Sequence, residues 1–358
     1  MIATGTGLPL TSLSTANPGA SGTGSAIVPE EAWRSAVAAI RGAERLLLVC
    51  HVNPDGDALG SMLRCGLGLR SLGLRVQATF SGPQHLPKVF TETLRGMDLL
   101  VPPDQVDPDP DVLVTFDAAS VERVGEFADR MNDVNHVIVL DHHASNPGFG
   151  TINLVDPAAA ATAMLVDELL GRLGVPLDRD IGQCLYVALS TDTGSFKYQA
   201  TTPRVHEFAA RLLAVGVDQY ETSRRLFDTR PFGALKLFGE ALSRIRLEPD
   251  AARGAGFVWT HTTLGDLARY GQPPYVLESL IDMVRTAEEA DVACVAKQVA
   301  ELTWAVSLRS RGAVDVAGLA TALGGGGHPY AAGFTGVGEL PEVVGAIRSR
   351  LAGHLRLP

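Results

Sequence analysis

Short apolar runs alternate with segments of helical period along the first 217 residues of the chain. Four of these runs are typical of strands and lie at residues 45–50 (RLLLVC), 75–80 (RVQATF), 112–116 (VLVTF) and 137–140 (VIVL). Helical patterns lie at residues 58–72, 158–173 and 204–213, whereas residues 184–190 fit a helix or a strand. Because the runs at 112–116 and 137–140 are short and continuously apolar, we expect helices to cover both faces of these strands. The pattern predicts an α/β fold with a doubly wound, mainly parallel sheet.

The pattern changes after residue 217. Residues 221–247 have an Arg-rich helical pattern and are predicted to connect two domains. Beyond them we expect strands near 256–259, 292–299 and 302–308, helices near 277–287, from 316 and from 342, and a glycine-rich turn at 324–327. This mixture predicts a smaller α+β domain. The expected organisation is an uncharged, disordered leader (1–27), a first domain (28–217), a helical linker (218–250) and a second domain (251–358).

Composition and charge exclude several classes of protein. The chain carries 30 Lys and Arg against 40 Asp and Glu, a formal net charge of −10, which opposes non-specific binding to long duplex nucleic acid. No apolar run approaches the roughly 20 residues of a membrane span. No basic residue precedes Arg34, so we expect no signal peptide, a cytoplasmic location and no membrane partner. The four cysteines lack CxxC spacing and are predicted to be core thiols.

Acids and histidines follow three of the predicted strands directly. They are His51, Asp55 and Asp57 after the first strand, Asp117 after the third, and Asp141, His142 and His143 after the fourth. The carboxyl ends of neighbouring parallel strands meet at one edge of a sheet, so these side chains are expected to share a small volume. So many like charges need compensation by divalent metal. Carboxylates with few imidazoles favour Mn²⁺, with Mg²⁺, Fe²⁺ or Co²⁺ able to replace it.

Each of these acids also has a structural interpretation. A single Asp after a strand is commonly a turn residue or a helix cap, and Asp57 could cap the helix predicted from Ala58. Three acid-ended strands together favour the metal interpretation. Such a cluster can hold two ions about 3.5–4 Å apart, the arrangement that suits an in-line phosphoryl displacement.

Five motifs resemble the DHH phosphoesterase family and its accompanying DHHA1 domain. They are HVNPDGDALGS (51–61), the Asp of VLVTFDAAS (112–120), VLDHHASN (139–146), STDTGSF (190–196) and GGGGHPYAAGF (324–334). The motifs occur in the family's order, and the resemblance extends over about 28–358. The compact two-domain form is similar to oligoribonucleases that also dephosphorylate 3′-phosphoadenosine 5′-phosphate. Other relatives of this form hydrolyse cyclic di-AMP and the dinucleotide pApA.

The resemblance also implies roles for individual residues. It assigns His51 and Asp55 to one Mn²⁺ ion, Asp57, His142 and Asp192 to a second, and Asp117 to both. The assignment of Asp192 rests on the resemblance alone, because residues 191–194 by themselves are typical of a turn at a helix end. The resemblance places His143 against the substrate phosphate and gives Asp141 a role in orienting a ligand or handling a proton.

Substrate contacts are expected from the second domain. The backbone of Gly325, Gly326 and Gly327 can approach an anion closely, and His328 can donate to a phosphate or stack on a base. Arg309 is a candidate for bidentate phosphate contact or an ordinary exposed charge, and Arg311 would share its face if the strand continued.

The sequence therefore predicts a two-metal hydrolase of short nucleotides: pApA, short RNA, 3′-phosphoadenosine 5′-phosphate and cyclic di-AMP. We expect domain closure through residues of about 217–250, and the resemblance implies a homodimer. Three alternatives remain open at this point. They are a single-strand exonuclease, a manganese pyrophosphatase of the same superfamily, and a catalytically silent nucleotide sensor.

Overall fold

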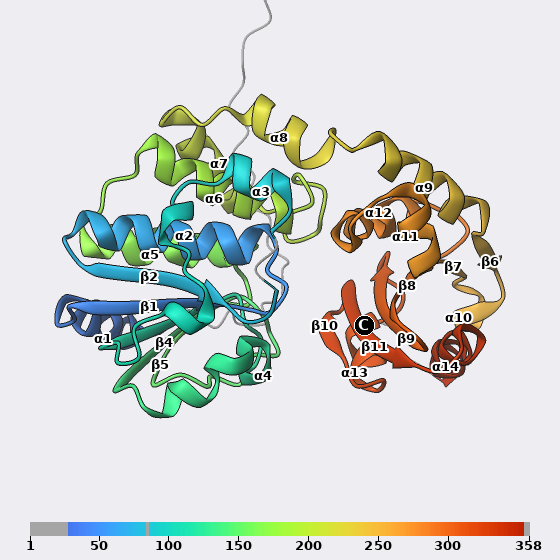
Figure 1. Cartoon of the computed structure of the whole chain (residues 1–358), viewed down its shortest axis with the longest axis horizontal. Helices are drawn as coiled ribbons and strands as arrows, with labels where there is room; N and C mark the ends of the chain where they lie inside the picture. Colours follow the sequence, from blue (N-terminus) through green and yellow to red (C-terminus); the bar gives the residue numbers. More distant parts are fainter. Residues whose placement is uncertain (1–27, 84–85, 354–358) are drawn as a thin grey trace, which may run out of the picture.

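A computed structural model describes residues 28–83 and 86–353 (Figure 1). The predicted disordered leader, residues 1–27, lies outside the described residues. Among the helices described, none is both long and apolar enough to cross a membrane. All four cysteines are buried and unpaired, which confirms their prediction as core thiols.

A five-stranded sheet forms the centre of the first half of the chain. Its strands are β1 (Arg45–Cys50), β2 (Arg75–Phe80), β3 (Val112–Phe116), β4 (His136–Asp141) and β5 (Ile152–Val155). The order is β2-β1-β3-β4-β5, and every neighbouring pair is parallel. The predicted α/β fold with a parallel sheet is confirmed. All these strands therefore direct their carboxyl ends to the same edge.

Helices cover both faces of this sheet (Figure 1). They are α1 (Glu30–Arg41), α2 (Gly56–Ser71), α3 (Lys88–Thr93), α4 (Val121–Val124), α5 (Thr162–Leu173), α6 (Arg179–Asp192) and α7 (Pro203–Ala214), with 3-10 turns at Met97–Leu99, Pro103–Gln105, Gly125–Phe127 and Asp129–Asn132. Side chains alternate along β1: Leu46 and Leu48 join the core beneath α2, α5 and α6, whereas Leu47 and Val49 join the core beneath α4.

The second half of the chain contains a six-stranded mixed sheet. Its strands are β6 (Arg246–Glu248), β7 (Phe257–Thr262), β8 (Val292–Ala300), β9 (Thr303–Ser310), β10 (Gly326–His328) and β11 (Ala331–Val337), in the order β10-β11-β9-β8-β7-β6. The helices are α8 (Gln219–Phe227), α9 (Phe232–Ser243), α10 (Ala251–Gly254), α11 (Leu264–Tyr270), α12 (Leu280–Val284), α13 (Val316–Thr321) and α14 (Leu340–Gly353), with a 3-10 helix at Pro274–Ser279. β7 and β8 pair in parallel, and the other pairs are antiparallel. The predicted second, α+β domain has this sheet as its centre.

The segment that joins the two sheets differs in part from the prediction. It is helical over α8 and α9 (Figure 1), but Leu247 lies in strand β6 rather than in a helix. Leu237 and Phe238 of α9 pack in one core with Val258 of β7. The second part of the predicted linker therefore shares the core of the second sheet, and the boundaries at 217 and 250 stay predictions.

Four other elements refine the predicted pattern. Residues 184–190, which were compatible with two structures, belong to helix α6. The short strand β5 was not predicted. The helix predicted from Ala158 begins at Thr162, and the glycine-rich turn becomes strand β10 from Gly326 onward.

Candidate active site

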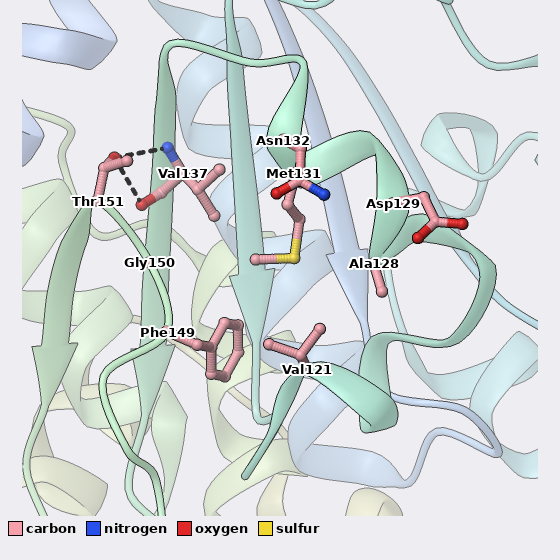
Figure 2. A pocket seen from close by; sticks show the side chains of 9 residues that line it. All are labelled: Val121, Ala128, Asp129, Met131, Asn132, Val137, Phe149, Gly150 and Thr151. Atoms are coloured by element: carbon pink, nitrogen blue, oxygen red, sulfur yellow. Dashed lines mark hydrogen bonds between the residues drawn. The ribbon is translucent and has the colours of Figure 1, made fainter.

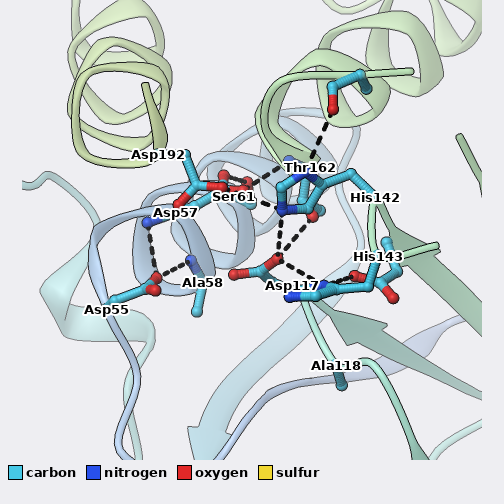
Figure 3. A network of polar contacts seen from close by, with 12 residues as sticks. Asp55, Asp57, Ala58, Ser61, Asp117, Ala118, His142, His143, Thr162 and Asp192 are labelled. Carbon is cyan, nitrogen blue, oxygen red and sulfur yellow. Dashed lines mark hydrogen bonds and ion pairs between the residues drawn. The ribbon is translucent and has the colours of Figure 1, made fainter. Parts of the chain in front are cut away.

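The carboxyl edge of the first sheet gathers the acids and histidines that the sequence singled out in the first domain. Figure 3 shows six of them: Asp55, Asp57, Asp117, His142, His143 and Asp192. His51 follows β1, Asp117 follows β3, Asp141 ends β4, and Asp192 ends α6. Among the described residues, four groups have ligand atoms close enough together to hold a metal ion. The first two are His51 with Asp55 and Asp117, and Asp57 with His142 and Asp192; the other two are His142 with His143 and His328, and Asp117 with Asp141 and His143. The first two groups contain the residues of the two ligand sets that the resemblance implied, except that of these two only the first contains Asp117, which the resemblance assigned to both ions.

The start of helix α2 places two carboxylates differently. Asp55 is the N-cap, because its Oδ1 accepts the backbone N–H groups of Asp57 and Ala58 at 3.0 and 3.1 Å. Asp57 is fully buried and instead accepts the N–H groups of Thr162 and Ala163, the first residues of α5. The alternative in which Asp57 caps the helix from Ala58 is therefore wrong. Asp57 ties α2 to α5 at the edge of the site.

Asp117 lies between the two groups. Its Oδ2 is 3.7 Å from Nε2 of His51, and its Oδ1 is 3.4 Å from Nε2 of His142. The backbone of Asp117 is left-handed, with φ of 56°, and its N–H donates to the Leu140 carbonyl on the neighbouring strand. Thr162 Oγ1 donates to Asp117 Oδ1 at 3.0 Å. One oxygen of the Asp117 carboxylate therefore faces the group of His51, and the other faces the group of His142.

Backbone carbonyls orient the two histidines. His51 Nδ1 lies 2.8 Å from the Val52 carbonyl oxygen, and His142 Nδ1 lies 3.2 Å from that of Ala159. With Nδ1 turned to a carbonyl, Nε2 of each ring faces the carboxylates. Histidines that bind metal are held in this way. Nε2 of His142 is 3.0 Å from Asp192 Oδ2.

Burial and crowding of like charges perturb these carboxylates. Burial, reinforced by the charges of Asp117 and Asp192, raises the pKa of Asp57 well above its ordinary value. Burial also raises the pKa of Asp192 to about 6. Burial opposes ionisation of Asp117 as well, but the hydrogen bond and the charge of His142 outweigh it and lower that pKa. A nearby positive charge stabilises the ionised form of these carboxylates, and divalent cations supply such a charge.

His143 is held by a second carboxylate. Its Nδ1 lies 2.7 Å from Asp141 Oδ1, and Asn146 Nδ2 donates to Asp141 Oδ2 at 2.6 Å. Burial opposes the charged form of His143, but the bond to Asp141 and the charge of Asp117 outweigh burial and raise its pKa. Asp141 is completely buried, so its position is fixed. The arrangement keeps the His143 ring in one orientation.

His328 brings the second domain into contact with the site. Its ring stacks on His143, with ring centroids 4.4 Å apart and an interplanar angle of 21°, and it also lies beside His142. Burial, together with the charges of His143 and His142, lowers the pKa of His328 to about 4. A neutral ring at this place can accept or donate one hydrogen bond.

The glycines before His328 differ in whether their backbone N–H groups are already hydrogen-bonded within the fold. The N–H groups of Gly324 and Gly325 donate to carbonyls at the end of α13, so the expected backbone contact through Gly325 has no free N–H. Gly326 and Gly327 lie in β10, the edge strand of the sheet. Gly327 has φ of 140°, and a Cβ there would lie 2.5 Å from the Ala331 carbonyl oxygen, so only glycine fits.

The two candidate arginines differ in position. Arg309 is in β9, and its Nη1 donates to the carbonyl of Leu308. Strand β9 ends at Ser310, and Arg311 donates to the carbonyls of Ala287 and Glu288. Arg311 therefore does not share the face of Arg309.

A cavity of about 360 Å³ lies apart from this centre. Figure 2 shows it beside β4, lined by Val121, Ala128, Asp129, Met131, Asn132, Val137, Phe149, Gly150 and Thr151. None of the predicted site residues lines this cavity.

Four residues contact the site residues but were not predicted from the sequence to have a role there. Thr162 bonds Asp117, Ser61 donates to Asp57, Asn146 donates to Asp141, and Arg123 Nη2 lies 3.0 Å from His51 Nδ1. Ser61 and Asn146 lie inside the quoted motifs, which was their only signal. Thr162 and Arg123 reach the site through tertiary packing and carry no signal in the sequence pattern.

Comparison with known proteins matches both parts of the chain. The DHH family, N-terminal domain, matches residues 45–189, and the DHHA1 domain matches residues 265–353. The chain is 34% identical over 317 residues to the bifunctional oligoribonuclease and PAP phosphatase NrnA of Thermus thermophilus, covering 87% of this chain and 92% of that protein. This chain belongs to the DHH phosphoesterase family. It is therefore an enzyme, a hydrolase of phosphate esters.

Further relatives of this DHH phosphoesterase share its length and fold. The NrnA protein of Bacillus subtilis is 25% identical, with 81% of this chain and 88% of that protein covered. An exopolyphosphatase-related protein from Bacteroides fragilis has the same fold, with a TM-score of 0.82 at 23% identity, covering 92% of this chain and 97% of that one. The family is metal-dependent, and the site contains groups that can hold metal.

Proposed function

We propose that this DHH phosphoesterase hydrolyses short nucleotides at a centre of two Mn²⁺ ions. The substrates are short oligoribonucleotides, linear or cyclic dinucleotides such as pApA and cyclic di-AMP, and 3′-phosphoadenosine 5′-phosphate. The names of the NrnA relatives, oligoribonuclease and PAP phosphatase, support the first and last of these. The sequence resemblance supports the others.

One observation carries the two-ion proposal: the position of Asp117. Its two carboxylate oxygens face the imidazoles of two different candidate groups, at 3.7 and 3.4 Å. His51 and Asp55 complete one ligand set, and Asp57, His142 and Asp192 complete the other. Oxygen and imidazole ligands without thiolate suit Mn²⁺ or Mg²⁺. When bound, two such ions supply positive charge that polarises a phosphate and an attacking water.

The other residues act on the substrate in this proposal. Asp141 holds a proton on Nδ1 of His143, which leaves Nε2 as the free edge of that ring. The raised pKa of His143 favours its cationic form, which attracts a phosphate. His328, Gly326 and Gly327 of the second domain approach the same region, and Arg309 stays a candidate phosphate contact. A site closed by a second domain admits short chains better than long ones.

Initial rates on a panel of substrates test the function. The panel contains pApA, a short RNA, 3′-phosphoadenosine 5′-phosphate, cyclic di-AMP and pyrophosphate, each with Mn²⁺ and with EDTA. We expect turnover of the nucleotides with Mn²⁺ and none with EDTA. Asp117→Asn should lower the rate by about a thousandfold or more, whereas Asp133→Asn, an exposed acid of the same domain, should not change it.

Three results would contradict the proposal. Binding of cyclic di-AMP without any turnover would indicate a sensor, and preference for pyrophosphate would indicate a pyrophosphatase. Normal turnover by Asp117→Asn would disprove the site assignment. The homodimer and the cytoplasmic location expected from the sequence stay predictions, of which light scattering tests the first.

A further inference from the structure

Tyr198 forms a contact between the two domains outside the metal groups. Its hydroxyl donates to Asp282 Oδ1 of helix α12 at 3.2 Å. The Arg285 guanidinium lies over the Tyr198 ring, 4.9 Å from its centroid, and Arg285 Nε donates to the same Asp282 oxygen at 3.1 Å. One side chain of the first domain thus contacts a carboxylate and a cation of the second.

The segment that carries Tyr198 begins at Asp192 and has an unusual backbone. Gly194, Ser195 and Phe196 are consecutive left-handed residues, with φ of 56°, 59° and 64°. This conformation is unfavourable for residues with a Cβ, so other contacts must maintain it. The Thr193 carbonyl accepts the N–H groups of Lys197 and Tyr198 at 2.9 and 3.0 Å. These bonds fold the segment back on itself.

The ring of Tyr198 packs on the backbone next to Asp192. A Cβ added to Gly194 would lie only 2.2 Å from Cζ of Tyr198, so the ring and the glycine are in direct contact. Gly194 is two residues from Asp192, whose Oδ2 is 3.0 Å from Nε2 of His142. A continuous path of contacts therefore runs from Asp282 and Arg285 through the Tyr198 ring to the turn that bears Asp192.

We propose that Tyr198 is a positioning residue that couples docking of the second domain to the placement of Asp192. Its effect on turnover rests on the proposed function, whereas its effect on the turn does not. When Asp282 and Arg285 are in place, the tyrosine ring supports the left-handed turn and Asp192 faces His142. When the second domain moves away, the hydroxyl loses its acceptor and the turn loses its support. His328 leaves the site in the same movement, so both domains complete the centre together.

Hydrogen exchange tests this coupling without any substrate. Asp282→Ala changes only the second domain, and we expect exchange of the amides of Lys197 and Tyr198 in the first domain to rise by about fivefold, the factor of one net hydrogen bond. Glu288→Ala, an exposed acid nearby in the same domain, is the matched control and should leave this exchange unchanged. Equal exchange in Asp282→Ala and the unaltered protein would overturn the proposal.

A double-mutant cycle tests the consequence for turnover. Tyr198→Phe keeps the ring on Gly194 and removes only the hydroxyl. We expect Tyr198→Phe and Asp282→Ala each to lower kcat/KM on pApA by about fivefold, the double variant to be no worse than either, and Asp282→Asn, which keeps an acceptor oxygen, to restore most of the rate.

Multiplying effects in the double variant, or no effect in either single variant, would overturn the coupling. If the unaltered protein hydrolyses no nucleotide, the proposed function fails. The exchange experiment then still decides the role of Tyr198.

Discussion

Asp192 illustrates how much of the site depends on single residues. It is the residue whose role rested on the resemblance alone, and the structure places it against His142 and near Asp57. Its helix-end position explains why the sequence pattern gave no metal signal: Asp192 is the last residue of α6 and not the end of a strand. The acids after strands were predictable, because the continuous apolar runs of buried strands are visible in the sequence.

Asp192→Asn should separate metal binding from stability. The substitution removes a partly buried carboxylate from a set of like charges and keeps an oxygen that can accept a bond from His142. Without metal, we expect the free energy of unfolding of the variant to equal or exceed that of the unaltered protein by up to about 1 kcal/mol. Adding Mn²⁺ should stabilise the variant only slightly. Urea unfolding with Mn²⁺ and with EDTA measures both. An undiminished gain from Mn²⁺ would contradict the assignment.

At the scale of elements, tertiary contacts explain the differences from the predicted boundaries. Helix propensity supports a start at Ala158, but the carboxylate of Asp57 accepts the N–H groups of Thr162 and Ala163 and so sets the start of α5. Strand β5 is only four residues long, and β6 only three. Such short segments carry too little periodicity to be predicted.

Arg64 on α2 gives a prediction about packing. The side chain is 1% exposed, and within the described residues its Nε and Nη1 atoms have no hydrogen-bond partner. Burial lowers its pKa to about 10. Because buried guanidinium nitrogens without a hydrogen-bond partner are costly, Arg64→Met should raise the free energy of unfolding by about 1 kcal/mol.

The matched control for this substitution is Arg70→Met on the same helix. Arg70 is 45% exposed and pairs with Asp98, so its replacement should change stability by less than about 0.5 kcal/mol. Thermal unfolding compares the two variants. A loss of stability in Arg64→Met larger than in the control would show that the guanidinium has a structural role.

The ion pair between Arg244 and Asp266 predicts a dependence of stability on pH. Hydrogen bonds from Arg244 to buried Asp266, at 2.5 and 2.9 Å, lower the pKa of the carboxyl. A carboxyl whose pKa is lower in the folded state stabilises the fold above its unfolded pKa of about 3.9. This contribution is lost as the pH falls below about 5.

Asp266→Asn should therefore cost about 2 kcal/mol at pH 7 and clearly less near pH 3. Urea unfolding at both values measures the difference between variant and unaltered protein. Asp98, which forms an exposed ion pair with Arg70, provides the control. Asp98→Asn should change the free energy of unfolding only slightly at either pH. A cost of Asp266→Asn that is equal at pH 7 and pH 3 would disprove the linkage.

At the scale of the whole molecule, part of the net charge of −10 is concentrated in the candidate active site. Five acids, Asp55, Asp57, Asp117, Asp141 and Asp192, gather at one edge of one sheet. The two fold classes were predictable from the sequence, because strand and helix periods differ. The approach of His328 to His143 was not, because the packing of one domain on another leaves no periodic pattern.

The number of Mn²⁺ ions bound per chain tests the central claim most directly. Titration of metal-stripped protein, followed by calorimetry or by the spin-resonance signal of free Mn²⁺, gives this number without any substrate. The account predicts two ions per chain, and loss of at least one in Asp117→Asn, whose oxygens face both groups. One ion or none in the unaltered protein, or two ions bound equally well by Asp117→Asn, would contradict it.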